Sequence, residues 1–118
     1  MTNPTPEFYR FDPLTGCNNF LSFVETLDQL AAAEERIAFS ILYFGMNYMG
    51  RLNETNGYAY GDSVLRWLSI VLQEESHAPA YRIGWDNFAL ILTKGVYTED
   101  EALLNRIFAR LNTEGKQL

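Results

Sequence analysis

The stretch "YRIGWDNFALIL", Tyr81 to Leu92, decides the fold. Two apolar runs flank the residues at 84–87, and glycine with small polar residues is typical of a hairpin turn. We therefore expect antiparallel strands at residues 81–83 and 88–93. Trp85 is the anomaly, because it places a bulky side chain in a turn that should be small and polar.

Helical patterns lie on both sides of this hairpin. Before it, Asp62 is expected to cap a helix that the sequence "HAPA" ends. After it, Thr98 and Glu101 have the spacing of a capping box, which predicts a helix from Thr98 to about Asn112. The apolar positions that mark these two helices are Val64, Leu65, Leu68, Val71 and Leu72 in the first, and Leu104, Ile107, Phe108 and Leu111 in the second.

The first third of the chain adds a helix and a strand. Asn18 or Asn19 is expected to cap an amphipathic helix over residues 19–34. Residues 36–44 are a nearly unbroken apolar run, which predicts a strand buried on both faces, and a short helical turn is expected at residues 47–52. The helix is marked by Phe20, Phe23, Val24, Leu27, Leu30 and Ala31.

The bulk properties indicate one compact domain of the α+β class. The chain has 118 residues, 47% of them hydrophobic, and alternates helices with strands around one hairpin. Its formal charge of −6 argues against a nucleic-acid partner. A single cysteine, Cys17, excludes a disulfide within the chain. No apolar segment is long enough to cross a bilayer and no signal peptide opens the chain, so we expect a cytoplasmic domain without membrane contact.

Four segments together resemble the GGDEF family, the diguanylate cyclase domains. "DPLTGCNNFLSF" at residues 12–23 is similar to the family's D-x-L-T-G-L-x-N-R-x-x-F, and "NETNGYAYGDSVL" at residues 53–65 to N-D-x-x-G-H-x-x-G-D-x-x-L. The hairpin stretch is similar to R-x-G-G-D-E-F followed by a strand, and the strand ending at Gly45 matches the family's first metal-binding strand. The resemblance implies a nucleotidyl-cyclase-like fold with a central, mostly antiparallel sheet flanked by helices. It divides the chain into a linker or tail at residues 1–11 and a GGDEF domain at residues 12–118, which ends near the point where the family continues through another strand.

Members of the family join two GTP molecules into cyclic di-GMP, with two domains facing each other and divalent metals on the triphosphates. The resemblance places a metal-binding acid at Gly45 and a second at Asn47, and a phosphate-binding cation at Gly50. None of the three positions keeps its charge. Hard cations need carboxylate oxygens, so a Mg²⁺ or Mn²⁺ ion is expected only if a nucleotide binds.

The signature turn itself is Gly84-Trp85-Asp86-Asn87-Phe88. Asp86 keeps the acidic third position, a metal ligand in the family, whereas Asn87 replaces the catalytic Glu and Trp85 replaces the second Gly. Glycine lets a backbone approach a nucleotide closely, which Trp85 cannot do cheaply. The resemblance thus leaves Asp86 as a weak metal-ligand candidate and no confident catalytic residue.

Among the other family positions, the guanine-binding residues are kept and the residues of the inhibitory product site are lost. Asn53 and Asp62 match the residues that hydrogen-bond guanine, although each is equally well explained as a turn residue and a helix cap. The family's inhibitory product site, R-x-x-D, falls on Glu75 to Ala78 and lacks both charged residues, so we expect no product feedback there. Simple structural roles are expected for Arg82 as a strand residue with an exposed head, and for Cys17, His77 and the tyrosines.

The sequence therefore predicts a degenerate GGDEF domain that is catalytically inactive and serves regulation or interaction in cyclic di-GMP signalling. We expect it to act as a homodimer or beside a sensory or EAL-type domain. Residual binding of GTP is a second hypothesis, carried by Asn53 and Asp62. An active diguanylate cyclase with atypical metal ligands, carried by Asp86, and a purely structural dimerisation domain are the remaining alternatives.

Overall fold

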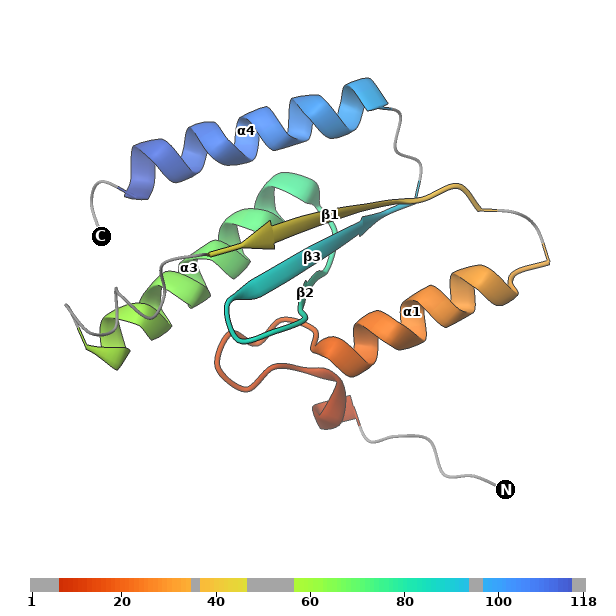
Figure 1. The fold of residues 1–118 in the computed structure, drawn as a ribbon, viewed down its shortest axis with the longest axis horizontal. Helices are drawn as coiled ribbons and strands as arrows, with labels where there is room; N and C mark the ends of the chain where they lie inside the picture. The colour runs from red at the N-terminus through yellow and green to blue at the C-terminus, as the bar shows by residue number, and fades with distance from the viewer. Residues whose placement is uncertain (1–6, 35–36, 47–56, 94–96, 116–118) are drawn as a thin grey trace.

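The computed structural model describes residues 7–34, 37–46, 57–93 and 97–115. Figure 1 shows the elements in chain order. They are the 3-10 helix η1 (Glu7–Arg10), α1 (Phe20–Ala32), β1 (Ser40–Gly45), α3 (Tyr58–Ser76), β2 (Ala80–Arg82), β3 (Asn87–Leu92) and α4 (Tyr97–Gly115). In this part of the chain no helix is long and apolar enough to cross a membrane.

The strands form one antiparallel sheet in the order β1-β3-β2. β3 is central, because it pairs with β2 across the hairpin and with β1 on its other side. The register places Gly45 opposite Asn87 and Arg82 opposite Phe88. The predicted α+β class, with an antiparallel sheet flanked by helices, is confirmed, and the two hairpin strands each begin one residue earlier than expected.

Helices cover both faces of the sheet. α3 and α4 lie side by side (Figure 1), and one face of the sheet packs against them through Phe88 and Leu90. Tyr81 points to the opposite face, since successive residues of a strand alternate between faces. There its ring contacts that of Phe23 on α1, with ring centroids 5.6 Å apart, and its hydroxyl lies 3.2 Å from Oγ1 of Thr26. The β2 side of the sheet is thus enclosed between α1 and α3.

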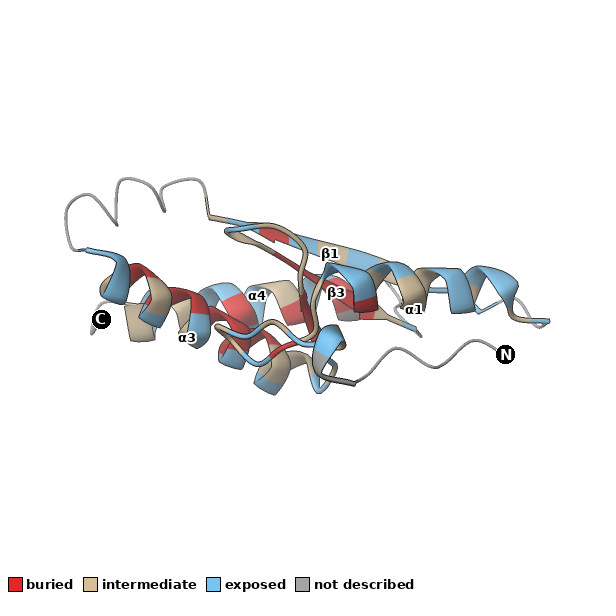
Figure 2. Cartoon of the chain, turned by 90° about the horizontal axis from the view of Figure 1, so that it is seen from below, coloured by how far each residue is buried: buried red, intermediate tan, exposed pale blue. Residues whose placement is uncertain are grey.

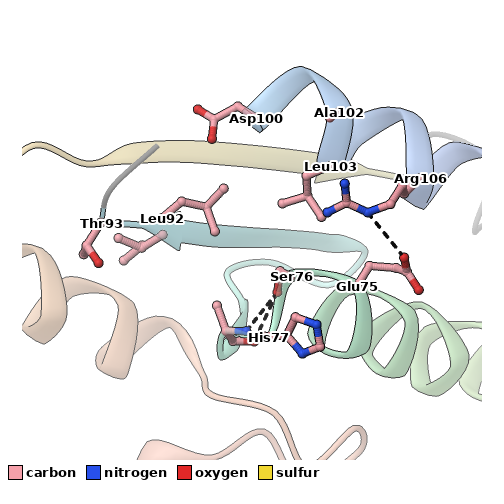
Figure 3. Close-up of a pocket in the computed structure, with 11 residues that line it drawn as sticks. Glu75, Ser76, His77, Leu92, Thr93, Asp100, Ala102, Leu103 and Arg106 are labelled. Atoms are coloured by element: carbon pink, nitrogen blue, oxygen red, sulfur yellow. Dashed lines mark hydrogen bonds and ion pairs between the residues drawn. The ribbon is translucent and has the colours of Figure 1, made fainter. Parts of the chain in front are cut away.

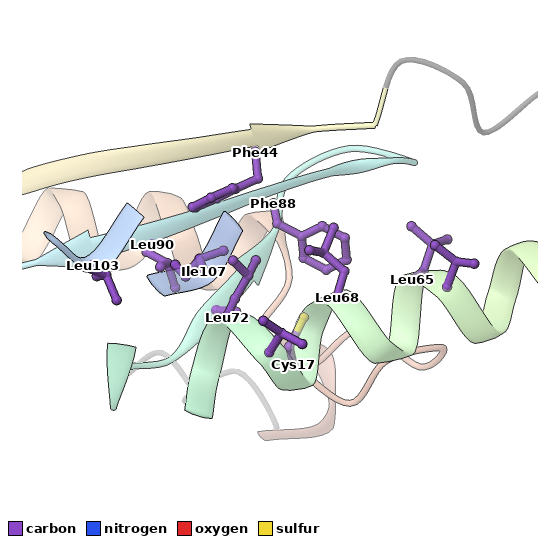
Figure 4. Close-up of a cluster of buried hydrophobic side chains, with 12 residues drawn as sticks. Cys17, Phe44, Leu65, Leu68, Leu72, Phe88, Leu90, Leu103 and Ile107 are labelled. Carbon is purple, nitrogen blue, oxygen red and sulfur yellow. The ribbon is translucent and has the colours of Figure 1, made fainter. Parts of the chain in front are cut away.

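The core lies between the sheet and the helices α3 and α4 (Figure 4). Its buried members are Cys17, Phe44, Val64, Leu65, Leu68, Val71, Leu72, Ala80, Phe88, Leu90, Leu103 and Ile107. Each large apolar side chain removed from water stabilises the fold by about 1.5–3 kcal/mol. The structural role expected for Cys17 is confirmed, because its side chain is buried in this core, and its Sγ also lies 2.9 Å from Oγ1 of Thr15.

The prediction that the first strand is buried on both faces is wrong. Along β1 the residues alternate between at least partly buried and exposed, and Ile41 and Tyr43 are 45% and 62% exposed. Figure 2 shows the exposed colour at alternate residues of β1. β1 is the edge strand of the described sheet, so only the face with Leu42 and Phe44 packs against helices.

Helix boundaries agree with the sequence at one end of the chain and differ in the middle. Asn19 caps α1 as expected, because its Oδ1 accepts a hydrogen bond of 3.0 Å from the backbone N–H of Ser22. The capping role predicted for Asp62 is wrong. α3 begins four residues earlier at Tyr58, after Gly57, whose φ of 87° favours glycine.

Other boundary predictions fall partly outside the description. The helical turn at residues 47–52 lies outside the described residues, as does the side chain of Thr98, the first residue of the predicted capping box. The end of α3 is as expected: the helix stops at Ser76, and His77 takes a left-handed conformation with φ of 54° in the exposed segment that follows.

A charged cluster fastens α3 to α4. The guanidinium of Arg110 on α4 contacts Glu74 at 2.6 Å and Glu75 at 3.2 Å, both on α3, and Glu114 of its own helix at 2.8 Å. These carboxylates come from the ends of the two helices, where the buried core gives way to solvent. Arg110 therefore joins the two helices at one point along their length.

Candidate functional site

The hairpin turn between β2 and β3 carries the signature residues, and backbone hydrogen bonds hold it on both sides. The N–H of Ile83 donates to the carbonyl of Asn87 at 3.0 Å, and the N–H of Gly84 donates to the same carbonyl at 3.4 Å. The N–H of Met46 donates to the carbonyl of Asp86 at 3.1 Å, which ties the end of β1 to the turn. The structure thus brings together the end of the first strand and the signature turn.

The side chain of Arg82 connects this turn to the loop before α1. Its Nη2 and Nε donate to the carbonyl of Trp85 at 2.6 and 3.2 Å, while its Nη1 lies 3.1 and 3.2 Å from the two carboxylate oxygens of Asp12. The side chain of Arg82 is only 12% exposed, so the prediction of an exposed strand residue is wrong. A planar guanidinium with five donors can serve the loop and the turn together, which a lysine cannot do.

Asp12 is the partner that sequence reasoning missed. Burial alone would raise the pKa of its carboxyl, but hydrogen bonds from the backbone and hydroxyl of Thr15 and the positive charge of Arg82 together hold that pKa below its ordinary value. The signal was present in "DPLT", because an Asp that accepts from a residue a few positions on is a common turn device. The ionised carboxylate therefore links the loop before α1 to the hairpin.

Gly45 and Asn87 face each other at the strand end where the resemblance places a metal-binding acid and a catalytic Glu. A Cβ atom at Gly45 would lie 3.3 Å from Oδ1 of Asn87, 3.2 Å from Cε1 of Tyr43 and 3.4 Å from the hydroxyl of Tyr43. Tyr43 precedes Gly45 by two residues, and this i,i+2 spacing, which puts both on one face, was the signal available in the sequence. The ring of Tyr43 and the amide of Asn87 thus border the side of Gly45 on which a side chain would project.

Asn87 also lies in the space that a side chain at Gly84 would need. A Cβ there would meet Nδ2 of Asn87 at 2.8 Å, closer than real Cβ contacts come. The amide of Asn87 therefore lies between Gly84 and Gly45, and its two polar atoms face the two glycines. A side chain introduced at either glycine would therefore have to displace this amide.

Trp85 and Asp86 are the outward residues of the turn. Trp85 is 54% exposed, so most of its ring faces solvent rather than covering a neighbouring patch. Asp86 is partly exposed and has no ion-pair partner among the described residues. In the same part of the chain, no group of three acidic, histidine or cysteine side chains is close enough to hold a metal ion.

The two predicted guanine-binding residues are not brought together by what the structure describes. Asp62 lies in the early part of α3, partly buried, with no hydrogen bond or ion pair to the described residues. Asn53 lies outside the described residues. Guanine binding by this pair stays a prediction.

A separate cavity of about 510 Å³ lies between the end of α3, β3 and the start of α4 (Figure 3). The residues matching the family's inhibitory motif, Glu75 to Ala78, line it. Glu75 is paired with Arg106 at 3.8 Å and with Arg110 at 3.2 Å, and Asp100 lies across the cavity in Figure 3. An acid thus stands where the family motif has its arginine, and the absence of product feedback stays a prediction.

Comparison with known proteins agrees with this fold. The family model described as diguanylate cyclase, GGDEF domain, matches residues 9–117, so the chain belongs to the GGDEF family. YhcK, a protein of Bacillus subtilis, is 36% identical over 87 residues. That alignment covers 70% of this chain but only 24% of YhcK, so the chain spans about a quarter of that relative.

Solved structures show the same fold at low identity. The GGDEF domain of DgcB from Caulobacter crescentus, in complex with c-di-GMP, has a TM-score of 0.83 at 21% identity, covering 96% of this chain and 66% of that one. The FimX GGDEF domain from Pseudomonas aeruginosa gives 0.76 at 24%, with 86% and 65% covered. The S helix-GGDEF-EAL portion of Vibrio cholerae LapD, bound to c-di-GMP, gives 0.75 at 22%, with 87% and 26% covered.

Proposed function

We propose that this chain is a GGDEF domain of cyclic di-GMP signalling that does not make cyclic di-GMP and serves instead as a regulatory or interaction module. The observation that carries the proposal is the contact between Asn87 and the two glycines, Gly45 and Gly84. The uncharged amide of Asn87 lies beside both glycines, at the strand end where the family resemblance places a metal-binding acid and a catalytic Glu.

Charge gives the second reason. Joining two nucleoside triphosphates requires divalent ions, and these ions require hard anionic ligands. Gly45 supplies no side chain and Asn87 supplies an uncharged amide, which leaves Asp86 as the acid at this turn. Each missing charge contact costs several kcal/mol of transition-state stabilisation, and the losses here coincide at one site. The donor set does not fit a pair of metal ions.

The domain arrangements of similar proteins support a regulatory role. LapD carries its GGDEF domain between an S helix and an EAL domain, and the diguanylate cyclase SiaD of Pseudomonas aeruginosa was solved in complex with its activator SiaC. By analogy, the chain would act in the cytoplasm as a homodimer or next to a sensory or EAL-type domain. The analogy is one of fold, because the identities are 22–23%.

The test is a direct assay of the purified chain. The protein is incubated with GTP and either Mg²⁺ or Mn²⁺, and products are separated and identified by mass, with an intact cyclase as the positive control. We expect no cyclic di-GMP above a reaction without protein. Metal-dependent product that disappears in Asp86→Asn would overturn the proposal and favour an active cyclase with atypical ligands.

Binding of a guanine nucleotide without turnover is a second candidate. It is favoured by Asp62, whose carboxylate neither caps α3 nor forms a hydrogen bond or ion pair with another described residue. An ionised Asp can accept from the ring and exocyclic nitrogens of guanine. Calorimetric titration with GTP, with ATP as the specificity control, tests it. Asp62→Asn should abolish the heat while the exposed control Asp28→Asn keeps it, and equal heats for GTP and ATP would exclude guanine recognition.

A further inference from the structure

The cavity beside the start of α4 contains a carboxylate without a described partner. Asp100 is only 9% exposed, yet its carboxylate forms no hydrogen bond or ion pair with a described residue. It is not completely enclosed either, because Oε2 of Glu25 is the one fully enclosed side-chain oxygen without a hydrogen bond in the described part of the chain. Figure 3 shows the Asp100 side chain on the side of α4 that faces the sheet, where it lines the cavity. The carboxylate therefore meets the open space of this cavity.

A place near the start of a helix does not by itself account for Asp100. Acids are favourable there, because the free backbone N–H groups of the first turn carry partial positive charge. Such an acid has this benefit while it stays in water, whereas removing a carboxylate from water without a partner opposes folding. Glu101, the next residue of α4, is exposed. The burial of Asp100 is thus a cost that helix formation does not require.

Apolar side chains border this carboxylate. The cavity of about 510 Å³ is within the size range of small-molecule sites, and Leu92 of β3 and Leu103 of α4 line it together with Ala78 and Ala102. None of its described lining residues belongs to β1 or lies beyond Arg106 on α4. The ends of α3 and β3 and the start of α4 therefore form the cavity, away from the outer edge of the sheet.

The charges around the cavity leave the carboxylate of Asp100 unbalanced. Glu75 also lines the cavity, but Arg110 contacts it at 3.2 Å and Arg106 contacts it at 3.8 Å. Neither arginine forms an ion pair with Asp100. A metal ion would need several hard ligands, and no group of three acidic, histidine or cysteine side chains in the described ranges could hold one. A single carboxylate beside apolar walls is suited instead to an organic cation with an apolar body.

We propose that this cavity binds a small alkylamine. Its ammonium group donates charge-assisted hydrogen bonds to the carboxylate of Asp100, and its alkyl body lies against Leu92 and Leu103. Although Glu75 to Ala78 match the family's inhibitory motif, the charge of this ligand is opposite to that of the nucleotide product bound there in the family. The proposal does not depend on whether the domain has cyclase activity.

The experiment titrates pentylamine into the isotope-labelled chain at about pH 7, where an alkylamine is protonated. Backbone amide resonances are followed by NMR. We expect saturable shifts at Leu92, Asp100 and Leu103 with a Kd in the millimolar range, and no shift at Trp85 in the hairpin turn. Pentanol and pentanoate keep the same alkyl chain. Both should bind at least about tenfold more weakly, because pentanol lacks the charge and pentanoate carries the opposite one.

Variants separate the carboxylate of Asp100 from the general negative charge of the chain. Asp100→Asn should weaken pentylamine binding at least about tenfold, whereas Glu101→Gln, at an exposed position that does not line the cavity, should keep the parent affinity. Lys94→Met, at a lysine a few positions earlier in the sequence, should also leave the affinity unchanged.

The comparison of the three probes uses the parent chain, so it remains decisive even if Asp100→Asn does not fold. Equal affinities for pentylamine and pentanol would overturn the proposal, as would undiminished binding by a folded Asp100→Asn variant. Binding that appears only in Lys94→Met would show that the chain's own lysine takes the place of the ligand, which would also overturn it. Absence of saturable shifts at any amine concentration that leaves the chain folded would have the same consequence.

Discussion

Asp12 and Arg82, 70 positions apart in the chain, form an ion pair of 3.1 Å that joins the loop before α1 to the signature turn. Both side chains are largely shielded from solvent, and Arg82 also donates to the carbonyl of Trp85. The turn's conformation therefore depends on a residue near the N-terminal end of the domain. This link is independent of the acidic and glycine positions that the family uses for catalysis.

Replacing Arg82 should destabilise the fold more than replacing an exposed arginine. Arg82→Met leaves the carboxylate of Asp12 without its charged partner and removes both hydrogen bonds to the Trp85 carbonyl, at an expected cost of about 2–3 kcal/mol. Urea unfolding measures the loss. The control is Arg106→Met, whose exposed ion pair of 3.8 Å should contribute less than about 1 kcal/mol. Equal losses would show that the Asp12 link does not stabilise the turn.

Lowering the pH should reduce the free energy of unfolding, because Asp12 becomes protonated. Its pKa is lower in the folded chain than when unfolded, so its contribution is complete above the unfolded pKa, about 3.9, and is lost as pH falls through the lower folded value. The free energy of unfolding should therefore fall as the pH drops from about 5 through the unfolded pKa of Asp12. In Asp12→Asn the stability should be lower at neutral pH and the slope in this range shallower. Asp28→Asn, an exposed control, should keep the parent slope; an unchanged slope in Asp12→Asn would contradict the assignment.

Restoring an acid at Gly45 should strain the strand end rather than rebuild a metal site. Gly45→Asp adds a side chain against Tyr43 and Asn87 at 3.2–3.3 Å, which should cost about 1–2 kcal/mol. Tyr43→Ala removes one of these neighbours, so the cost of Gly45→Asp should shrink in the double variant. A double-mutant cycle by urea unfolding measures this coupling. Strictly additive losses would mean that the Tyr43 ring does not occupy the space in front of Gly45.

Removing the cap of α1 tests how the helix is anchored. Asn19→Ala loses the hydrogen bond to Ser22 and the contact between Nδ2 and the carbonyl of Tyr9, so we expect a loss of about 1 kcal/mol or somewhat more. Thermal or urea unfolding of the variant gives the value. Asn105→Ala, on the exposed side of α4, is the matched control and should be nearly neutral. A neutral effect at Asn19 would show that α1 starts without its help.

Local signals in the sequence were sufficient for the hairpin and for α1. The glycine and polar residues at 84–87 specify a tight turn, and Asn19 before an apolar periodic segment specifies a helix start. Both features depend on a few neighbouring residues. The strands of the hairpin must pair antiparallel once the turn is formed, so the centre of the sheet follows from the same stretch.

The start of α3 and the burial of β1 depended on contacts that are distant in sequence. Gly57 and Gly61 make the region resemble a loop, yet Gly61 is buried inside α3, where packing offsets the helix cost of glycine, about 1 kcal/mol. An apolar run such as residues 36–44 does not reveal whether its strand is central or at an edge. Position in the sheet decides that, and the sheet is assembled from elements that follow β1 in the chain.

Of the candidate site, only the residue replacements at and beside the hairpin turn could be predicted from the sequence. The losses at Gly45, Trp85 and Asn87 could be read from the family pattern, because each concerns one position. The contact of Asn87 with both glycines and the ion pair between Asp12 and Arg82 could not, since both need the strand register and loop path in three dimensions. Most arginines in folded proteins are exposed to solvent, so an Arg beside a turn is expected to be exposed unless its partner is known.

The Arg110 cluster has a mechanical consequence for any signal that enters through α4. Sliding α4 past α3 by one helical turn, about 5.4 Å, would break the contacts of this guanidinium with Glu74 and Glu75 together. Slippage between the two helices is thus opposed by this cluster, together with the ion pair between Arg106 and Glu75. A displacement of the C-terminal end of α4 along its axis should therefore be transmitted to the end of α3.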